Sequence, residues 1–104
     1  MKRLLAAALA VTALSTFGQA YPGSRPIAIV VPFAAGGPTD RVARDLAEAM
    51  RKTMGGGAHF VVENVGGAGG TIGATKVAKA APDGHTLLLF HIGMASTPAL
   101  YRKL

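Results

Sequence analysis

The stretch that decides the fold reads IAIVVPFAAGGPTD and runs from Ile27 to Asp40. It opens with a continuous apolar run rich in β-branched side chains, which is typical of a strand buried on both faces of a parallel sheet. The glycines Gly36 and Gly37 then break the strand. Thr39 or Asp40 is expected to cap a helix, because short polar side chains accept hydrogen bonds from the free amides of a first helical turn.

The helix after this loop is expected to be amphipathic and to end at the glycine run 55–57. Its charged residues fall outside the apolar stripe, and we expect them to form the solvent-exposed face of the helix. The apolar residues recur at helical spacing and form one stripe: Val42, Ala43, Leu46, Ala47, Met50 and Met54.

The same pattern of strand, glycine loop and helix then occurs again. His59 to Glu63 is expected to form a second strand, and the loop 64–70 leads to a helix from Thr71 to about Ala81. Thr71 is the expected cap of that helix, with Ile72, Val77 and Ala78 facing inward.

A third strand is expected from Thr86 to Phe90, and Thr97 with Pro98 is expected to open a third helix. Strands that alternate with helices predict an α/β fold of βαβαβ order, with a parallel sheet and right-handed crossovers. Ligands of such sheets bind at the carboxyl ends of the strands. The loops 33–40, 64–71 and 91–97 are therefore expected at one rim.

The first 20 residues are expected to be a secretory signal peptide. Lys2 and Arg3 precede an apolar run, and the small residues Gly18 and Ala20 occupy the positions that a signal peptidase reads, so cleavage is expected after Ala20. The run is shorter than the roughly 20 residues that span a bilayer. The chain contains no cysteine, so it is not expected to be a disulfide-rich secreted protein. For an exported chain, this absence favours a bacterial periplasmic location.

The remaining part, residues 21–104, is expected to be an incomplete piece of a larger domain. Three strands with unpaired edges close a core poorly. The formal net charge is +6 for the whole chain and +4 without the leader, which carries two of the basic residues. These charges are scattered, without a basic stripe among aromatics, and we therefore expect no nucleic-acid partner.

Each glycine loop leads into a helix start, an arrangement that binds anions. Glycine lets the backbone approach a ligand, and the first-turn amides carry partial positive charge. Such a loop can equally be a tight turn, but two at one rim favour a site for a carboxylate. Asp40 would repel an anion unless it is engaged elsewhere, so a supporting role in the first turn is expected for it.

Catalytic patterns are not found in the sequence. There is no Gly-x-Ser-x-Gly elbow and no Walker A motif, and the three histidines lack the spacing of a metal site. Gly67, Gly69 and Gly73 miss the dinucleotide fingerprint by one residue. We therefore expect no enzyme, no cofactor and no metal.

Three groups of residues resemble the Bug-type extracytoplasmic solute receptors of tripartite tricarboxylate transporters. The first group is Val30-Val31-Pro32-Phe33 with Gly36-Gly37 and Asp40, preceded by Tyr21-Pro22 and Pro26-Ile27 and followed by Ala43-Arg44. The second is Val62-Glu63-Asn64 followed by Gly67-Ala68-Gly69-Gly70 and Ile72-Gly73, and the third is Ala80-Ala81-Pro82-Asp83-Gly84 with the leucines 87–89. The resemblance covers all of residues 21–104.

The resemblance implies the first half-lobe of a type II periplasmic-binding-protein (Venus-flytrap) fold, truncated in this chain. It implies a small carboxylate as ligand and the membrane subunits of a tripartite transporter as partners. The chain departs from the family where Val65-Gly66-Gly67 and Ala34-Ala35 replace the usual prolines, which loosens both loops. The ligand-binding residues that the resemblance singles out are Phe33, Gly36, Gly37, Thr39, Asp40, Gly67, Ala68, Gly69, Thr71 and Ser96.

Two other hypotheses remain open from the sequence. The chain could be the nucleotide-binding N-terminal segment of a dehydrogenase-like enzyme, or a non-functional product of a truncated gene. An uncleaved leader would favour the first of these alternatives. The DNA sequence beyond the codon for Leu104 would decide the second.

Overall fold

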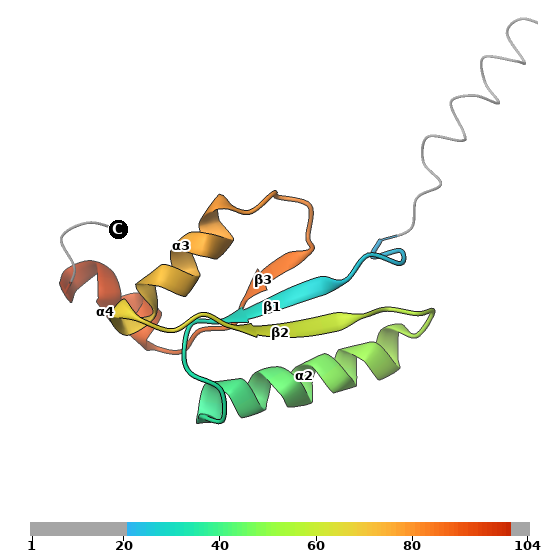
Figure 1. Ribbon diagram of the computed structural model, residues 1–104, viewed down its shortest axis with the longest axis horizontal. Helices are drawn as coiled ribbons and strands as arrows, with labels where there is room; N and C mark the ends of the chain where they lie inside the picture. Colours follow the sequence, from blue (N-terminus) through green and yellow to red (C-terminus); the bar gives the residue numbers. More distant parts are fainter. Residues whose placement is uncertain (1–20, 101–104) are drawn as a thin grey trace, which may run out of the picture.

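The structure is a computed structural model that describes residues 21–100, and both the expected leader and residues 101–104 lie outside the described residues. The described part is a three-stranded parallel sheet with helices on both faces (Figure 1). Its strands are β1 (Ile27–Val31), β2 (Phe60–Asn64) and β3 (Thr86–Leu88). Its helices are α2 (Pro38–Met54), α3 (Thr71–Lys79), α4 (Gly93–Leu100) and a short 3₁₀ turn, η1 (Ala68–Gly70).

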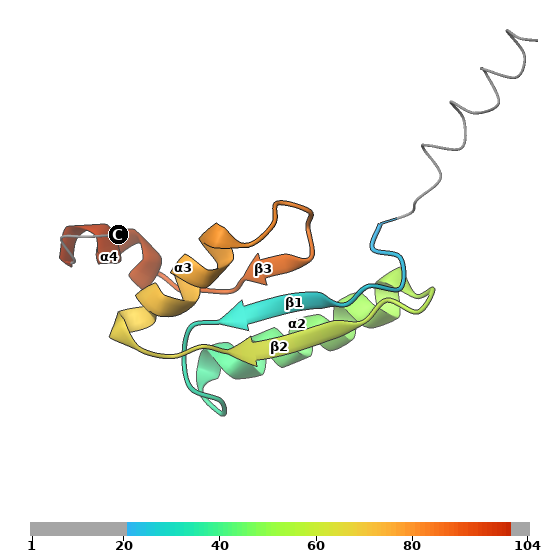
Figure 2. The same cartoon turned by 45° about the horizontal axis from the view of Figure 1, so that its top comes forward.

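The strand order is β2-β1-β3, so the first strand of the chain is the central one. Ile29 pairs with Val62 of β2 on one side and with Leu87 of β3 on the other. The chain therefore winds first to one side of β1 through α2 and then back across it through α3, which places the two helices on opposite faces. All three strands point toward the same end of the sheet, where the loops and α4 gather (Figure 2). The parallel βαβαβ sheet expected from the sequence is therefore confirmed, and the structure adds that it is doubly wound around β1.

The core lies around β1. Ile27, Ile29, Val30 and Val31 are almost fully buried, as expected for an apolar run covered on both faces. On the α2 side, Ile29 and Val31 pack with Ala43, whose small side chain brings the helix close to the sheet. Partly buried side chains extend this cluster: Phe33, Ala47, Phe60, Val62 and Leu89.

The apolar stripe of α2 is less buried than its spacing suggests. Ala43 is buried, whereas Val42, Leu46 and Met54 are 56%, 41% and 40% exposed. The three-stranded sheet contacts only the narrow strip of the helix that carries the small residues. In α3 the expected inward residue Ile72 is 53% exposed, and Ala78 is exposed as well, so both expectations were wrong.

The helix starts also differ from those expected. Gly37 precedes α2 and Gly70 precedes α3, and neither helix has a side-chain cap, so the expected caps Thr39, Asp40 and Thr71 were wrong. Pro38 instead occupies the start of α2, where its missing N–H costs no hydrogen bond.

The third helix also begins earlier than expected. It starts at Gly93 rather than at Thr97, and Pro98 lies inside it. Here the Thr97 hydroxyl donates to the carbonyl of Gly93, so this residue bonds back along its own helix instead of opening it. Within residues 21–100, no helix combines the length and the apolar character needed to cross a membrane.

Candidate ligand-binding site

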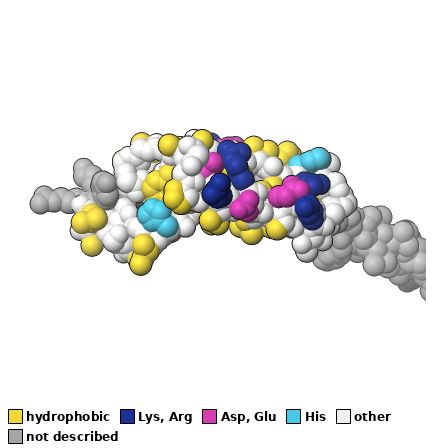
Figure 3. Space-filling model, turned by 90° about the horizontal axis from the view of Figure 1, so that it is seen from below, with side chains coloured by type: hydrophobic (Ala, Val, Ile, Leu, Met, Phe, Trp, Pro, Cys, Tyr) yellow, Lys and Arg dark blue, Asp and Glu magenta, His cyan; other side chains and the backbone are white. Residues whose placement is uncertain are grey.

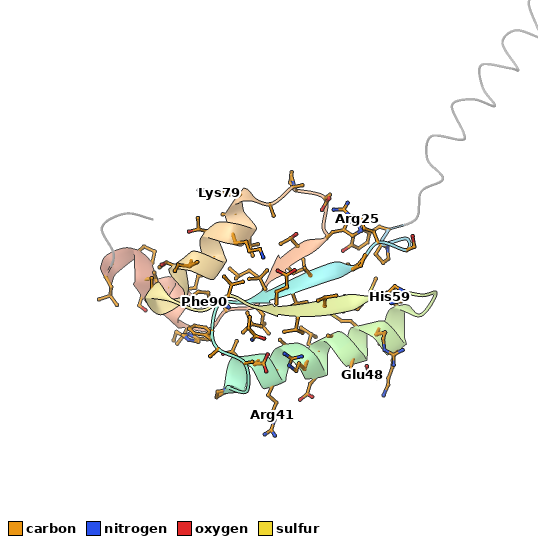
Figure 4. All side chains as sticks on the ribbon, in the orientation of Figure 1. Arg25, Arg41, Glu48, His59, Lys79 and Phe90 are labelled. Atoms are coloured by element: carbon orange, nitrogen blue, oxygen red, sulfur yellow. The ribbon has the colours of Figure 1, made fainter. Side chains whose placement is uncertain are left out.

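A hollow of about 440 Å³ lies at the carboxyl end of the sheet, between the loop after β1 and the loop after β3. Phe33 and Ala34, the start of α2 from Gly37 to Asp40, and His91 line it. The chain reverses its winding direction between β1 and β3, and ligands of open α/β sheets bind at this switch point. Figure 4 labels Phe90 at this end and His59 at the opposite end.

The first turn of α2 supplies free amides to the hollow. Pro38 has no N–H, and the first intrahelical bond runs from the Arg41 amide to the Gly37 carbonyl at 3.1 Å. The amides of Thr39 and Asp40 precede that bond and have no partner within the helix. Together with the helix dipole, these two N–H groups favour a negatively charged group in the hollow.

Asp40 is the buried acid beside these amides, and its carboxylate is fully engaged. Its Oδ2 accepts hydrogen bonds from the Gly36 amide at 2.9 Å and from Arg44 Nε at 3.0 Å, and its Oδ1 accepts one from Asn64 Nδ2 at 2.9 Å. The bonds from Arg44, Gly36 and Asn64 lower the pKa of Asp40 from 3.8 to about 2. The carboxylate is therefore ionised at neutral pH, but Arg44 compensates its charge.

This network fixes the loop that forms the wall of the hollow. Asn64, at the end of β2, also donates to the Phe33 carbonyl at 3.3 Å and accepts from Arg44 Nη2 at 3.3 Å. One side chain thus ties the β1 loop, the start of α2 and the end of β2 together. The i,i+4 spacing of Asp40 and Arg44 was visible in the sequence, but the part played by Asn64 was not.

Gly36, at the turn of this loop, is required by the backbone conformation there. Gly36 has φ +90°, a conformation that other residues rarely adopt, and its N–H is already bonded to Asp40. The expectation that this amide is available for a ligand is therefore wrong. Gly36 does not line the hollow but an adjacent surface depression together with Arg41 and Arg44.

Three aromatic rings pack together between the loops after β1 and β3. The rings of Phe33 and His91 are stacked, with centroids 4.6 Å apart and planes at 11°. Phe90 meets both rings edge-on, at 5.3 Å from Phe33 and 5.2 Å from His91. Phe33, a residue expected at the site, therefore supports His91 as well as lining the hollow.

The second glycine loop lies at the same end of the sheet but does not line the hollow of about 440 Å³. Gly67, Ala68 and Gly69 all have positive φ, and they form the 3₁₀ turn or lead into it. Gly70 packs against the Phe33 and Phe90 rings, leaving no room for a Cβ atom. The second loop therefore packs against the loop after β1, where a Cβ on Gly66 would lie 3.6 Å from the Ala34 nitrogen, but of the two helix starts only that of α2 lines this hollow.

The two remaining site candidates, Thr71 and Ser96, form hydrogen bonds to carbonyls three residues before them in the chain. The Thr71 hydroxyl donates to the Ala68 carbonyl at 2.9 Å, and its side chain lines an apolar cleft between α3 and α4. Ser96 is exposed on α4 and donates to the Gly93 carbonyl at 3.1 Å. The structure thus gathers Phe33, Gly37, Thr39 and Asp40 at one hollow and places the other predicted residues around it.

Within residues 21–100, no group of three His, Cys, Asp or Glu side chains could hold a metal ion. On the face seen in Figure 3, acidic side chains lie beside basic ones. Among the described residues, Arg51 and Glu48 form one such pair of opposite charges, at 2.8 Å.

Two solved structures share this fold. The periplasmic binding protein BugD aligns with a TM-score of 0.73 and 62% identity over 79% of this chain and 26% of its own. MatC from Rhodopseudomonas palustris with bound malate aligns with a TM-score of 0.59 and 56% identity over 65% of this chain and 22% of its own. The fold expected from the sequence, that of periplasmic binding proteins, is confirmed.

Sequence comparison identifies the family to which the chain belongs. The profile of the tripartite tricarboxylate transporter family receptors matches residues 11–104, and the chain belongs to this family. A relative from Agrobacterium vitis, the UPF0065 protein of the TAR-I ttuE-ttuC' intergenic region, is 53% identical over 98% of this chain and 30% of its own length. The chain thus spans about a third of the length of the curated relatives it matches.

Proposed function

We propose that residues 21–104 form the N-terminal part of lobe 1 of a periplasmic receptor that binds small carboxylates and serves the membrane subunits of a tripartite transporter. We further propose that the first 20 residues are a signal peptide that is cleaved after Ala20. The protein binds its solute and catalyses no reaction. The family assignment favours this function over the dehydrogenase-like alternative.

The observation that carries the proposal is the start of α2 facing the hollow. Two free amides there attract an anion, and Asp40 does not oppose it because Arg44 and Asn64 hold its charge. The hollow of about 440 Å³ lies within the range of small-molecule pockets. Malate in the related MatC gives the ligand class a first member to test.

The strength of binding follows from how much of the receptor this chain represents. In a two-lobed receptor the second lobe closes over the ligand, and this chain spans about 30% of the length of its relatives. A carboxylate held from one side only gains few contacts. We therefore expect the chain to bind malate with a Kd of about 1 mM or weaker.

Amide shifts in ¹⁵N-labelled full chain, titrated with malate, test the proposal directly. The Thr39 and Asp40 amides should shift, whereas those of Gly55 and Gly56 at the other end of α2 should not. The uncharged diamide of malic acid serves as the ligand control. If the diamide moved the same amides equally, or malate moved none of them, recognition of an anion at this helix start would be excluded.

A matched pair of variants sharpens this test. Thr39→Glu places a negative charge in the first turn, where it suits the helix dipole but repels a carboxylate ligand. Ala49→Glu adds the same charge on an exposed position about 15 Å along the helix. We expect Thr39→Glu to weaken malate binding at least about tenfold and Ala49→Glu to leave it within about twofold. Equal effects would point to net charge instead of a local site.

A further inference from the structure

His91 is exposed, yet three contacts fix the orientation of its ring. Phe33 stacks on one face at 4.6 Å, and Phe90 meets it edge-on at 5.2 Å. The Gly93 amide donates a hydrogen bond to His91 Nδ1 at 2.8 Å. A surface histidine that serves only as a solvated group needs none of these restraints.

The bond from Gly93 selects one form of the imidazole. Because Nδ1 accepts the hydrogen bond from the Gly93 amide, the neutral imidazole carries its proton on Nε2. Among residues 21–100, no hydrogen-bond partner of Nε2 is found. A Cβ atom on Gly93 would lie 2.6 Å from His91 Cε1 and 2.9 Å from Nδ1, so this close pairing requires glycine at position 93.

The ring lines the same hollow as the start of α2. Thr39 and Asp40 approach it from the helix, and His91 approaches it from the loop after β3. Since Arg44 already compensates Asp40, the Nε2–H of His91 is a side-chain donor that enters this hollow from a different element than the amides and the Thr39 hydroxyl of α2. The hollow therefore offers donors from two different elements.

We infer that His91 is a ligand-binding residue that determines specificity: its Nε2–H donates to a second oxygen-bearing group of the ligand, while the α2 amides hold the first carboxylate. This inference rests on the proposed function. A ligand with an acceptor at each end satisfies both sets of donors, whereas a monocarboxylate leaves His91 unpaired. The site therefore prefers dicarboxylates to monocarboxylates of the same chain length.

The test compares succinate with butyrate, which differ in one carboxylate, on the full chain and on two variants of His91. His91→Phe keeps an aromatic ring stacked on Phe33 but removes the N–H donor. It should raise the Kd for succinate about tenfold or more and leave that for butyrate within about twofold. His91→Gln carries an amide N–H close to the former Nε2 position and should recover part of the loss.

Imidazole ¹⁵N spectra of the unaltered chain provide a second test that needs no variant. Succinate should shift the His91 Nε2 signal, whereas His59 and His85 serve as internal controls. His59 lies at the opposite end of the sheet (Figure 4), and His85 Nε2 pairs with the Pro22 carbonyl at 3.1 Å.

The outcomes separate the inference from the proposed function. Succinate binding that shifts the Thr39 amide but not His91 Nε2, or that survives His91→Phe unchanged, would overturn the role of His91 and leave carboxylate binding intact. If the unaltered chain bound neither acid, the proposed function would fail and the role of His91 with it. A selective loss of succinate binding in His91→Phe would support both.

Discussion

Replacing Gly73 by alanine perturbs a close approach between α3 and the residues that directly follow β1 and β2. Gly73 is buried, and a Cβ atom built on it would lie 2.7 Å from Pro32 Cβ, 2.9 Å from Pro32 Cα and 2.9 Å from the Val65 carbonyl oxygen. Carbon atoms in contact normally stand about 3.5–4.0 Å apart. None of these atoms belongs to a flexible side chain, so α3 must move away by roughly 1 Å.

Two opposing free energies decide the result. Alanine is favoured over glycine inside a helix by about 1 kcal/mol. Overpacking a well-filled interior costs about 1–3 kcal/mol, and the rigid backbone neighbours of Gly73 place this case in the upper part of that range. We therefore expect a net destabilisation of about 1–2 kcal/mol, which lowers Tm by about 4–8 °C for each kcal/mol.

Thermal unfolding followed by circular dichroism measures this change. Gly66→Ala is the matched control, because its Cβ would lie 3.6 Å from the Ala34 nitrogen and 3.7 Å from the Phe33 carbonyl carbon, which are ordinary contacts. Its Tm should be unchanged or slightly raised. A Gly73→Ala chain that melts at or above the original Tm would refute the close packing of α3 on Pro32.

Two further predictions concern the buried Asp40. Its pKa is lowered from 3.8 to about 2 in the folded chain, so its stabilising contribution is complete above pH 3.8 and is lost as the pH falls toward 2. Urea unfolding should show the original chain losing its advantage over Asp40→Asn across this interval, and a constant difference would contradict the network. Arg44→Gln should weaken malate binding at neutral pH by exposing the ligand to the Asp40 charge, and adding Asp40→Asn should restore it. Calorimetric titration of the two single variants and the double variant measures this coupling, and strictly additive losses would argue against charge compensation.

The class of fold and the family were predictable from local patterns. The buried run of β1 fixed a parallel sheet, because an apolar segment without alternation must be covered on both faces. The order of strands and helices predicted right-handed crossovers, but the position of β1 between β2 and β3 came from the structure. The helix starts were predicted less well: Thr39, Asp40 and Thr71 are suitable caps by type, but Gly37 and Gly70 take that position. A preference for a cap is weak beside the geometry that a tight loop imposes.

The candidate site was only partly predictable. A glycine loop before a helix indicates an anion site whatever surrounds it, and this pattern predicts Gly37, Thr39 and Asp40 as site residues. The support that Asn64 gives to Asp40 comes from 24 residues away. The donor role proposed for His91 depends on its stacking with Phe33, another contact between distant segments.

By itself, the sequence determined what repeats locally: apolar runs, helical spacing, glycine turns and the family they define. These features depend on neighbouring residues, whose spacing the covalent chain fixes. Only the tertiary structure decided which glycine loop lines the hollow, that the Gly36 amide is already occupied, and that Arg44 offsets the charge of Asp40. Those outcomes depend on distances between strands and loops that are remote in the chain, and packing alone sets such distances.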